Sequence, residues 1–146
     1  MIEQSLYNQI VENIPICCVD VCILRENGIL LVKRNTEPAK NHWWVPGGRL
    51  YKNELLKDCA YRKAKEETNL DCVVGPIVHT DETVFDTGPQ NIPIHSINVC
   101  FLLMPKSLTV KLDQYSDDYK WVKRIPLDIH PYVGKCLEKC GLNYYK

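Results

Sequence analysis

The sequence has no excess of charge of either sign. Its 18 lysine and arginine residues balance 18 aspartate and glutamate residues, and it contains no run of basic residues. A protein that binds polynucleotides regardless of their sequence needs a basic surface to neutralise the phosphates. We therefore predict that the chain has no nucleic-acid partner.

Long apolar segments are also missing. No run approaches the roughly 20 apolar residues of a transmembrane helix. Residues 1–5 lack the basic and apolar regions of a signal peptide. We therefore predict no membrane partner. The 146 residues, 45% hydrophobic and 25% charged, suit a single folded domain over residues 1–146.

The eight cysteines lack the spacing of a metal or redox motif. No C-x-x-C pair occurs, three cysteines lie in an apolar run over residues 16–24, and two lie four residues apart in a predicted helix. Buried cysteine usually behaves as a small hydrophobic residue. We therefore predict free thiols and a reducing, cytoplasmic location.

Strand-like and helix-like segments alternate along the chain. Apolar and β-branched residues predict strands over residues 16–24, 29–34, 43–45, 73–85, 94–104 and 119–123. Asn27-Gly28 predicts a hairpin turn between the first two. Helices are predicted over residues 5–13, 53–68 and 131–139, with Asn53 and Asn69 capping the second at its start and end. The predicted fold class is α/β, a mixed sheet flanked by helices.

The predicted helix over residues 53–68 carries a polar stripe. Its members, spaced four residues apart, are Glu54, Asp58, Arg62 and Glu66. Arg62 can bridge the two glutamates and fix their geometry. Glu66-Glu67 supplies hard oxygen ligands that suit Mg²⁺ or Mn²⁺, and Gly47-Gly48 lets the backbone approach a ligand. Taken alone, the charged stripe also suits a solvated helix face.

These residues resemble the Nudix box, G-x5-E-x7-R-E-U-x-E-E-x-G-U. The matching positions are Gly48, Glu54, Arg62, Ala64, Glu66, Glu67 and Leu70. Asn69 replaces the glycine, and Lys63 replaces a glutamate that helps to hold metal in many members. The resemblance implies a Nudix α/β/α sandwich that hydrolyses a nucleoside diphosphate linked to another group, with Mg²⁺. Because Lys63 reverses a charge, we expect a site for one metal ion.

A narrower resemblance, over residues 15–121, is to the GDP-mannose mannosyl hydrolase branch. It rests on segments 33–35, 38–39, 43–49, 52–54 and 117–121. That branch also lacks the glutamate after the box arginine. In it, water attacks the sugar carbon, which releases free sugar and a nucleoside diphosphate. The branch forms dimers, so we also predict a homodimer that uses the N-terminal helix.

The resemblance assigns roles to particular residues. Arg34 and Arg49 would contact the diphosphate, Asp20 would belong to the nucleotide site, and the Gly47 carbonyl and Glu67 would bind the metal. The branch places a glutamine and a histidine, its metal ligand and general base, where this chain has Tyr115 and Ser116. Gln114 reaches the metal if the loop shifts by one residue. The base is unassigned; the candidates are Asp113, Glu82 and Asp86, with weaker arguments for His42, His79 and His95, the last of which also suits a core position.

The sequence therefore predicts Mg²⁺-dependent hydrolysis of a small nucleotide substrate, with a nucleotide sugar first. One alternative keeps the fold and has water attack phosphorus in ADP-ribose, a nucleotide sugar or an oxidised nucleotide. The Glu66-Glu67 pair favours it, because the mannosyl hydrolase branch usually keeps only the second glutamate. Another alternative is a Nudix-fold binding module without turnover, which Lys63 and the missing histidine favour.

Overall fold

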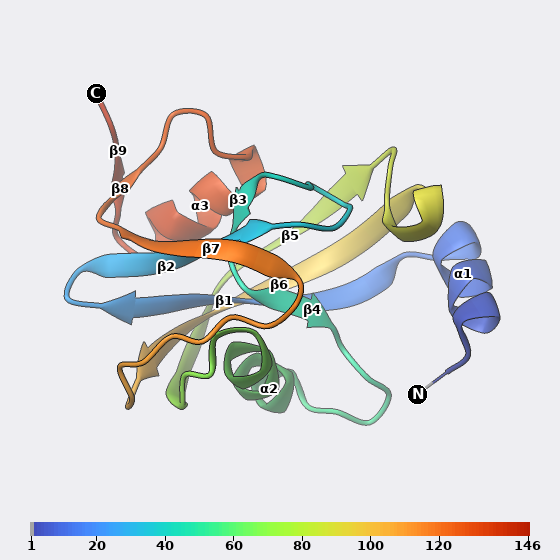
Figure 1. Ribbon diagram of the computed structural model, residues 1–146, viewed down its shortest axis with the longest axis horizontal. Coiled ribbons are helices and arrows are strands. Elements are labelled where there is room, and N and C mark those ends of the chain that lie inside the picture. The colour runs from blue at the N-terminus through green and yellow to red at the C-terminus, as the bar shows by residue number, and fades with distance from the viewer. Residues whose placement is uncertain (1) are drawn as a thin grey trace.

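In residues 2–146, which the computed structural model describes, a mixed seven-stranded sheet lies between two helices (Figure 1). The strand order is β3-β2-β1-β6-β5, and β4 and β7 pair with β1 and β2. The strands are β1 (Ile16–Arg25), β2 (Gly28–Arg34), β3 (Trp43–Trp44), β4 (Gly47–Arg49), β5 (Cys72–Phe85), β6 (Ile94–Pro105) and β7 (Ser116–Val122). A small second sheet pairs β8 (Arg124–Ile125) with β9 (Asn143–Tyr144). The predicted mixed-sheet α/β fold is confirmed.

Strand β1 is the centre of the sheet because both of its faces are covered. It pairs in parallel with β6 over Ile16–Ile23 and antiparallel with β4 and with the start of β2. Val19, Val21 and Ile23 face helix α2 (Leu56–Thr68), and Cys22 faces helix α3 (Pro131–Lys139). Its nearly continuous apolar sequence is typical of a strand buried on both sides.

Two helices each cover one face of the sheet, and Figure 1 shows α2 below it and α3 above it. Helix α2 packs Cys59, Ala60 and Ala64 into the core on its side. Helix α3 packs its apolar stripe into the other core, through Tyr132, Val133, Cys136 and Leu137. The third helix, α1 (Gln4–Asn13), packs through Val11 onto the end of the sheet, against Ile16 and Ile94.

The hairpin after β1 forms where the sequence predicts it, but its turn lies one residue earlier. Glu26 and Asn27 both have positive φ, 51° and 66°, and Arg25 pairs with Gly28. This register places Leu24 opposite Ile29. A turn at Asn27-Gly28 would instead place the charged Glu26 opposite the buried Ile29, which explains the difference.

The predicted start of the second helix is wrong. Helix α2 begins at Leu56, and Asn53 lies before it with φ 68°. Asparagine favours left-handed turn positions as well as N-caps, so its type alone does not distinguish them. Glu54 therefore reaches Arg62 from the preceding loop, not from the same helix. The predicted end is confirmed, because Asn69 has φ 64° at the C-cap.

All eight cysteines are free thiols, as predicted. Cys22 and Cys100 lie with their Sγ atoms 3.5 Å apart in the core under α3.

No helix within residues 2–146 has the length and apolar character needed to cross a membrane. In the loop before β6, Pro89–Asn91 forms one short 3₁₀ turn, η1.

Candidate active site

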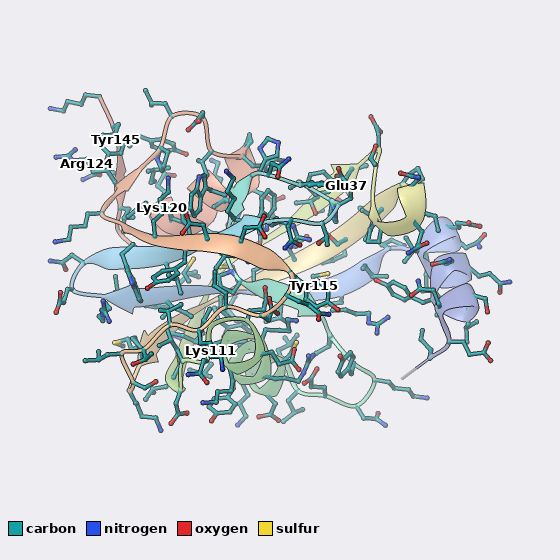
Figure 2. The ribbon with its side chains drawn as sticks, viewed as in Figure 1. Glu37, Lys111, Tyr115, Lys120, Arg124 and Tyr145 are labelled. Atoms are coloured by element: carbon teal, nitrogen blue, oxygen red, sulfur yellow. The ribbon has the colours of Figure 1, made fainter. Side chains whose placement is uncertain are left out.

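A cavity of about 800 Å³ lies over one end of the sheet, which we call the central cavity. It is bounded by the loop after β2, by β4, by α1 and η1, and by the α2 side chains of Lys63 and Glu67. Figure 2 shows two of its lining residues, Glu37 in the loop between β2 and β3 and Tyr115 just before β7. Five predicted site residues line it together: Asp20, Arg34, Gly47, Arg49 and Glu67.

Glu67 is the buried carboxylate on the α2 side of the cavity. Its side chain is 7% exposed, and its Oε2 atom accepts a 2.9 Å hydrogen bond from the Gly47 N–H. Burial raises the pKa of Glu67 to about 7, although Lys63 and the Gly47 N–H favour the charged form. A carboxylate withdrawn from water in this way gains from a bound cation.

Lys63 provides a cation at this position. Its Nζ atom lies 3.2 Å from Glu66 Oε2 and 3.5 Å from Glu67 Oε2. Burial acts to lower the pKa of Lys63, but the two carboxylates outweigh it and the pKa stands above its usual value. The ammonium group is therefore held charged between the two box glutamates.

Arg62 bridges Glu54 and Glu66, as the sequence predicts. It donates from Nε to Glu54 Oε2 at 2.7 Å, from Nη2 to Glu54 Oε1 at 2.9 Å, and from Nη1 to both Glu66 oxygens at 3.3 Å. A further bond, from Nη2 to the Arg49 carbonyl, ties α2 to β4. The Arg62 bonds hold the pKa of Glu54 down at about 2. Arg62 thus positions the box without lining the cavity.

The two predicted phosphate-binding arginines lie on separate strands that meet at the cavity. Arg34 ends β2, and its Nε donates to the Pro38 carbonyl at 2.7 Å. Arg49 ends β4, where its guanidinium lies 4.2 Å from the Tyr7 ring centroid and 5.5 Å from that of Tyr51. Stacking on aromatic rings orients a guanidinium, and a guanidinium can form bidentate bonds to phosphate oxygens.

The floor of the cavity is a row of buried polar side chains that crosses β5, β6 and β1. Its members, all less than 9% exposed, are Thr83, Ser96, Asn98 and Asp20. Thr83 and Ser96 hydroxyls lie 2.7 Å apart, Ser96 donates to Asn98 Oδ1 at 2.8 Å, and Asn98 donates to Asp20 Oδ2 at 2.9 Å. We call this group the polar row.

Asp20 ends the polar row and is its ionisable member, with a raised pKa. Its Oδ2 atom also accepts a 2.6 Å bond from the Tyr132 hydroxyl. Burial raises the pKa of Asp20 to about 6, against the lowering effect of its hydrogen bonds to Tyr132 and Asn98. A Cβ atom at position 47 would collide with this carboxylate, so only glycine lets β4 pass so close.

A family model described as "NUDIX domain" matches residues 17–132. The chain belongs to the Nudix family. The match covers both arginines, the box and the polar row. It supports the prediction of a Nudix hydrolase that acts on a small nucleotide.

Relatives of this Nudix protein differ in their described roles. "Low-salt glycan biosynthesis protein Agl8" of Haloferax volcanii is 34% identical over 139 residues, which cover 94% of this chain and 89% of the relative. An ADP-ribose pyrophosphatase of Methanocaldococcus jannaschii is 33% identical over 89 residues, 61% of this chain and 50% of the relative. The crystal structure of a MutT NUDIX hydrolase from Burkholderia pseudomallei superposes with a TM-score of 0.75 at 18% identity, covering 87% and 98% of the two chains. It confirms the Nudix fold.

Nudix hydrolases generally use Mg²⁺ or Mn²⁺, and the chain has donors that fit such an ion. No three His, Cys, Asp or Glu side chains in residues 2–146 are arranged to hold a metal on their own. Mg²⁺ is commonly held by one or two carboxylates together with substrate phosphates, so the Gly47 carbonyl and Glu67 form a suitable partial set. The Lys63 ammonium already marks this place as one that attracts a cation. Glu66, whose side chain is 47% exposed, is not among the lining residues of the cavity.

The candidate bases do not line the cavity: Asp113, Glu82, Asp86, His42, His79 and His95 are all absent from its lining. Asp113 still lies near enough to Glu67 for its charge to favour a higher pKa of Glu67. The candidate metal ligand Gln114 does not line the cavity either. The core position considered for His95 is wrong, because its side chain is 41% exposed and bonds Glu82 at 2.9 Å. Gln114 is exposed, and its carbonyl accepts a bond from Asn35. Tyr115 and Ser116 stand where the related branch has its glutamine and histidine. Ser116 is buried and pairs with Arg34, whereas Tyr115 lines the cavity.

Sequence reasoning missed several lining residues. Glu37 is the carboxylate of the loop after β2. Thr83, Ser96 and Asn98 of the polar row were also missed, although Ser96 and Asn98 alternate with His95 and Ile97 and so share the buried face of β6 with Ile94. That alternation is the signal that could have found them, since polar side chains at buried strand positions need a specific reason.

Proposed function

We propose that the chain is a Mg²⁺-dependent nucleotide-sugar hydrolase, with Mn²⁺ as a substitute metal, in which water attacks the sugar carbon. A sugar on a nucleoside diphosphate, such as GDP-mannose, is the leading substrate. The observation that carries the proposal is the presence, in one cavity, of an arginine and carboxylate wall beside the polar row. The wall suits a diphosphate, and the row suits the hydroxyl groups of a sugar.

The wall would bind the diphosphate and stabilise it as it leaves. Arg34 and Arg49 can form bidentate bonds to phosphate oxygens, which strengthen as negative charge builds up on the leaving group. Bound at Glu67 and the Gly47 carbonyl, Mg²⁺ would neutralise part of the same charge. Breaking the bond between the sugar carbon and the diphosphate oxygen then needs only weak assistance to the attacking water.

Glu37 is our candidate for that assistance. It is a carboxylate of the cavity lining for which no hydrogen bond or ion pair occurs within residues 2–146. The other lining carboxylates, Asp20 and Glu67, are buried and already engaged. A free carboxylate on a loop can accept a proton from water when the sugar is cation-like. Glu37→Gln should then lower kcat while leaving diphosphate binding intact.

The relatives support a sugar-containing substrate. The relative that is similar over nearly the whole chain is described as a glycan biosynthesis protein. Glycan synthesis draws on activated sugars, which is the class of compound that the cavity suits.

Hydrolysis in ¹⁸O-labelled water tests the proposal. A screen of nucleotide sugars with Mg²⁺ would first find the substrate, reading out free sugar against phosphate monoester. With that substrate, we expect the label on the released sugar and none on the nucleoside diphosphate. Label on phosphate would contradict attack at carbon.

Attack at phosphorus is a second candidate function. The specific observation in its favour is that both Glu66 and Glu67 are present at the end of α2, and a relative over 89 residues is described as an ADP-ribose pyrophosphatase. Attack of hydroxide on an anionic phosphorus favours several metal ions on a carboxylate-rich helix. This candidate predicts turnover of ADP-ribose to AMP and ribose phosphate, with the label on phosphate.

We also propose a homodimer that uses α1. The helix buries only Val11 among its own residues and exposes Leu6 by 47%. Its Gln4 and Tyr7 line the central cavity, so a partner chain bound at α1 would lie next to the site. Light scattering at micromolar concentration should give the mass of two chains, and a single-chain mass would contradict the dimer.

A further inference from the structure

The residue after the box arginine is the feature of the site that the proposed function does not use. Lys63 has its ammonium group 3.2 Å from Glu66 Oε2 and 3.5 Å from Glu67 Oε2, and it also lines the central cavity. A positive charge therefore lies beside Glu67, the carboxylate that would hold metal, and faces the space that would hold substrate.

The local structure keeps Lys63 in this place. Its side chain is 17% exposed, and its stem lies across Gly48 of β4. A Cβ atom at position 48 would lie 2.8 Å from Lys63 Cε, so a side chain there would displace the ammonium group. Arg62, one residue earlier, is engaged by Glu54 and does not compensate the charge of Glu67. Lys63 is thus the main cation that balances the charge of Glu67, with a smaller contribution from Arg34.

We propose that Lys63 is a built-in cation that occupies the place of a second metal ion, so that the site takes one divalent ion and the ammonium group contributes the second positive charge facing the diphosphate. This rests on the proposed function, because it assumes a metal at Glu67 and a diphosphate in the central cavity. Lys63 and a divalent ion at Glu67 compete for the same carboxylate. Each therefore weakens the binding of the other, while both attract the same phosphate oxygens.

The proposal predicts opposite effects of one substitution. Lys63→Met keeps most of the apolar stem and removes the charge. Without the competing ammonium, the variant should bind Mn²⁺ about 10-fold more tightly than the wild type, as read from the electron paramagnetic resonance signal of free Mn²⁺ near pH 8. With saturating Mg²⁺, it should bind a nucleoside diphosphate about 5-fold more weakly. GDP and ADP are both titrated by calorimetry, and the one that the wild type binds better is the probe.

A charge series sharpens the test. Lys63→Arg keeps the cation and should stay close to the wild type in both measurements. Lys63→Glu should bind a second Mn²⁺ ion for each chain, where the wild type binds one. Lys57→Met is the matched control, because it removes an exposed lysine from the same helix. It should change neither affinity. Lys63→Gln repeats the test with a polar side chain if thermal unfolding shows that the methionine variant is poorly folded.

A lysine that serves only to hold the fold would weaken both kinds of binding when removed. Unchanged or weaker Mn²⁺ binding by Lys63→Met and Lys63→Gln would overturn the proposal, and so would unchanged diphosphate binding. These readouts need no turnover. Label on phosphate in the ¹⁸O experiment would end the proposed chemistry, and the Mn²⁺ affinities would still decide the role of Lys63.

Discussion

The Nudix box contains two ion pairs, Glu54–Arg62 and Glu67–Lys63, whose cations are neighbours on α2. The pKa values of the two carboxyl groups are nevertheless shifted in opposite directions. The Arg62 bonds hold the pKa of Glu54 at about 2. Burial raises the pKa of Glu67 to about 7, even with Lys63 3.5 Å away. Arg62 keeps Glu54 ionised, whereas Glu67 depends on Lys63 and the Gly47 N–H to offset the effect of its burial.

Geometry explains the difference. Arg62 forms two short bonds to Glu54, at 2.7 and 2.9 Å, and its planar guanidinium matches both carboxylate oxygens. Lys63 divides one ammonium group between Glu66 and Glu67 and lies farther from each. The Glu54–Arg62 pair therefore joins parts of the scaffold, whereas the Glu67–Lys63 pair leaves a buried carboxylate that a stronger cation would stabilise.

The largest effect should come from Glu67. Glu67→Gln keeps the shape and the Gly47 contact but removes the charge that binds the metal, so kcat should fall about 1000-fold or more while the thermal midpoint stays near that of the wild type. Glu66→Gln is the comparison, because Glu66 does not line the cavity. We expect it to lose about 10-fold or less. Equal losses in the two variants would contradict the special place of Glu67.

The second effect concerns Arg49, which lines the central cavity with Glu67 and would bind the substrate. Arg49→Gln should lower kcat about 100-fold and raise KM by less, because the arginine binds the leaving diphosphate more strongly in the transition state than in the ground state. Steady-state kinetics on the substrate from the screen measures both constants. An unchanged kcat would place Arg49 outside the chemistry.

The third effect tests the scaffold pair and its pH dependence. Glu54→Gln should lower the free energy of unfolding at pH 7 by about 1–2 kcal/mol, since the pair is partly open to solvent. The native pKa of about 2 lies below the usual 4.5, so the carboxylate stabilises the fold fully above pH 4.5. That stabilisation is lost as the pH falls toward 2. Urea unfolding at several pH values should show the gap between wild type and variant closing over this range, and a gap that persists at pH 2 would refute it. Glu12→Gln, at an exposed position of α1, is the control.

The sequence predicts the strands of this fold well because their apolar patterns are long. Strand β6 spans Ile94–Pro105 against a prediction of 94–104, and helix α3 spans the predicted residues. Short or glycine-rich elements carry no such pattern. β4, with its sequence Gly-Gly-Arg, is a strand only because it pairs with β1. Asn53, predicted as the N-cap of α2, lies instead in the loop before the helix.

The candidate site divides in the same way. Residues in the box motif, such as Glu67 and Arg62, could be placed from spacing alone. The polar row could not, because Thr83, Ser96 and Asn98 join Asp20 only through the pairing of β5, β6 and β1. Glu37 lies on a loop whose path over the cavity depends on contacts such as the Arg34 bond to the Pro38 carbonyl. Long-range pairing, which residue types do not encode locally, decides both.

The smallest effect concerns Asn69 and separates stability from chemistry in this comparison. Asn69 ends the helix that carries both cations, with φ 64°, a conformation that costs alanine more than asparagine or glycine. Asn69→Ala should lower the free energy of unfolding by about 1 kcal/mol, and Asn69→Gly should change it by about 0.5 kcal/mol or less. Both should keep kcat within about 2-fold of the wild type, because neither touches Glu67 or Lys63. Urea unfolding and steady-state kinetics on the same preparations measure the two quantities. A large loss of kcat in Asn69→Ala would mean that small shifts at the end of α2 reach the metal site, and the loss in Glu67→Gln could then no longer be ascribed to its charge alone.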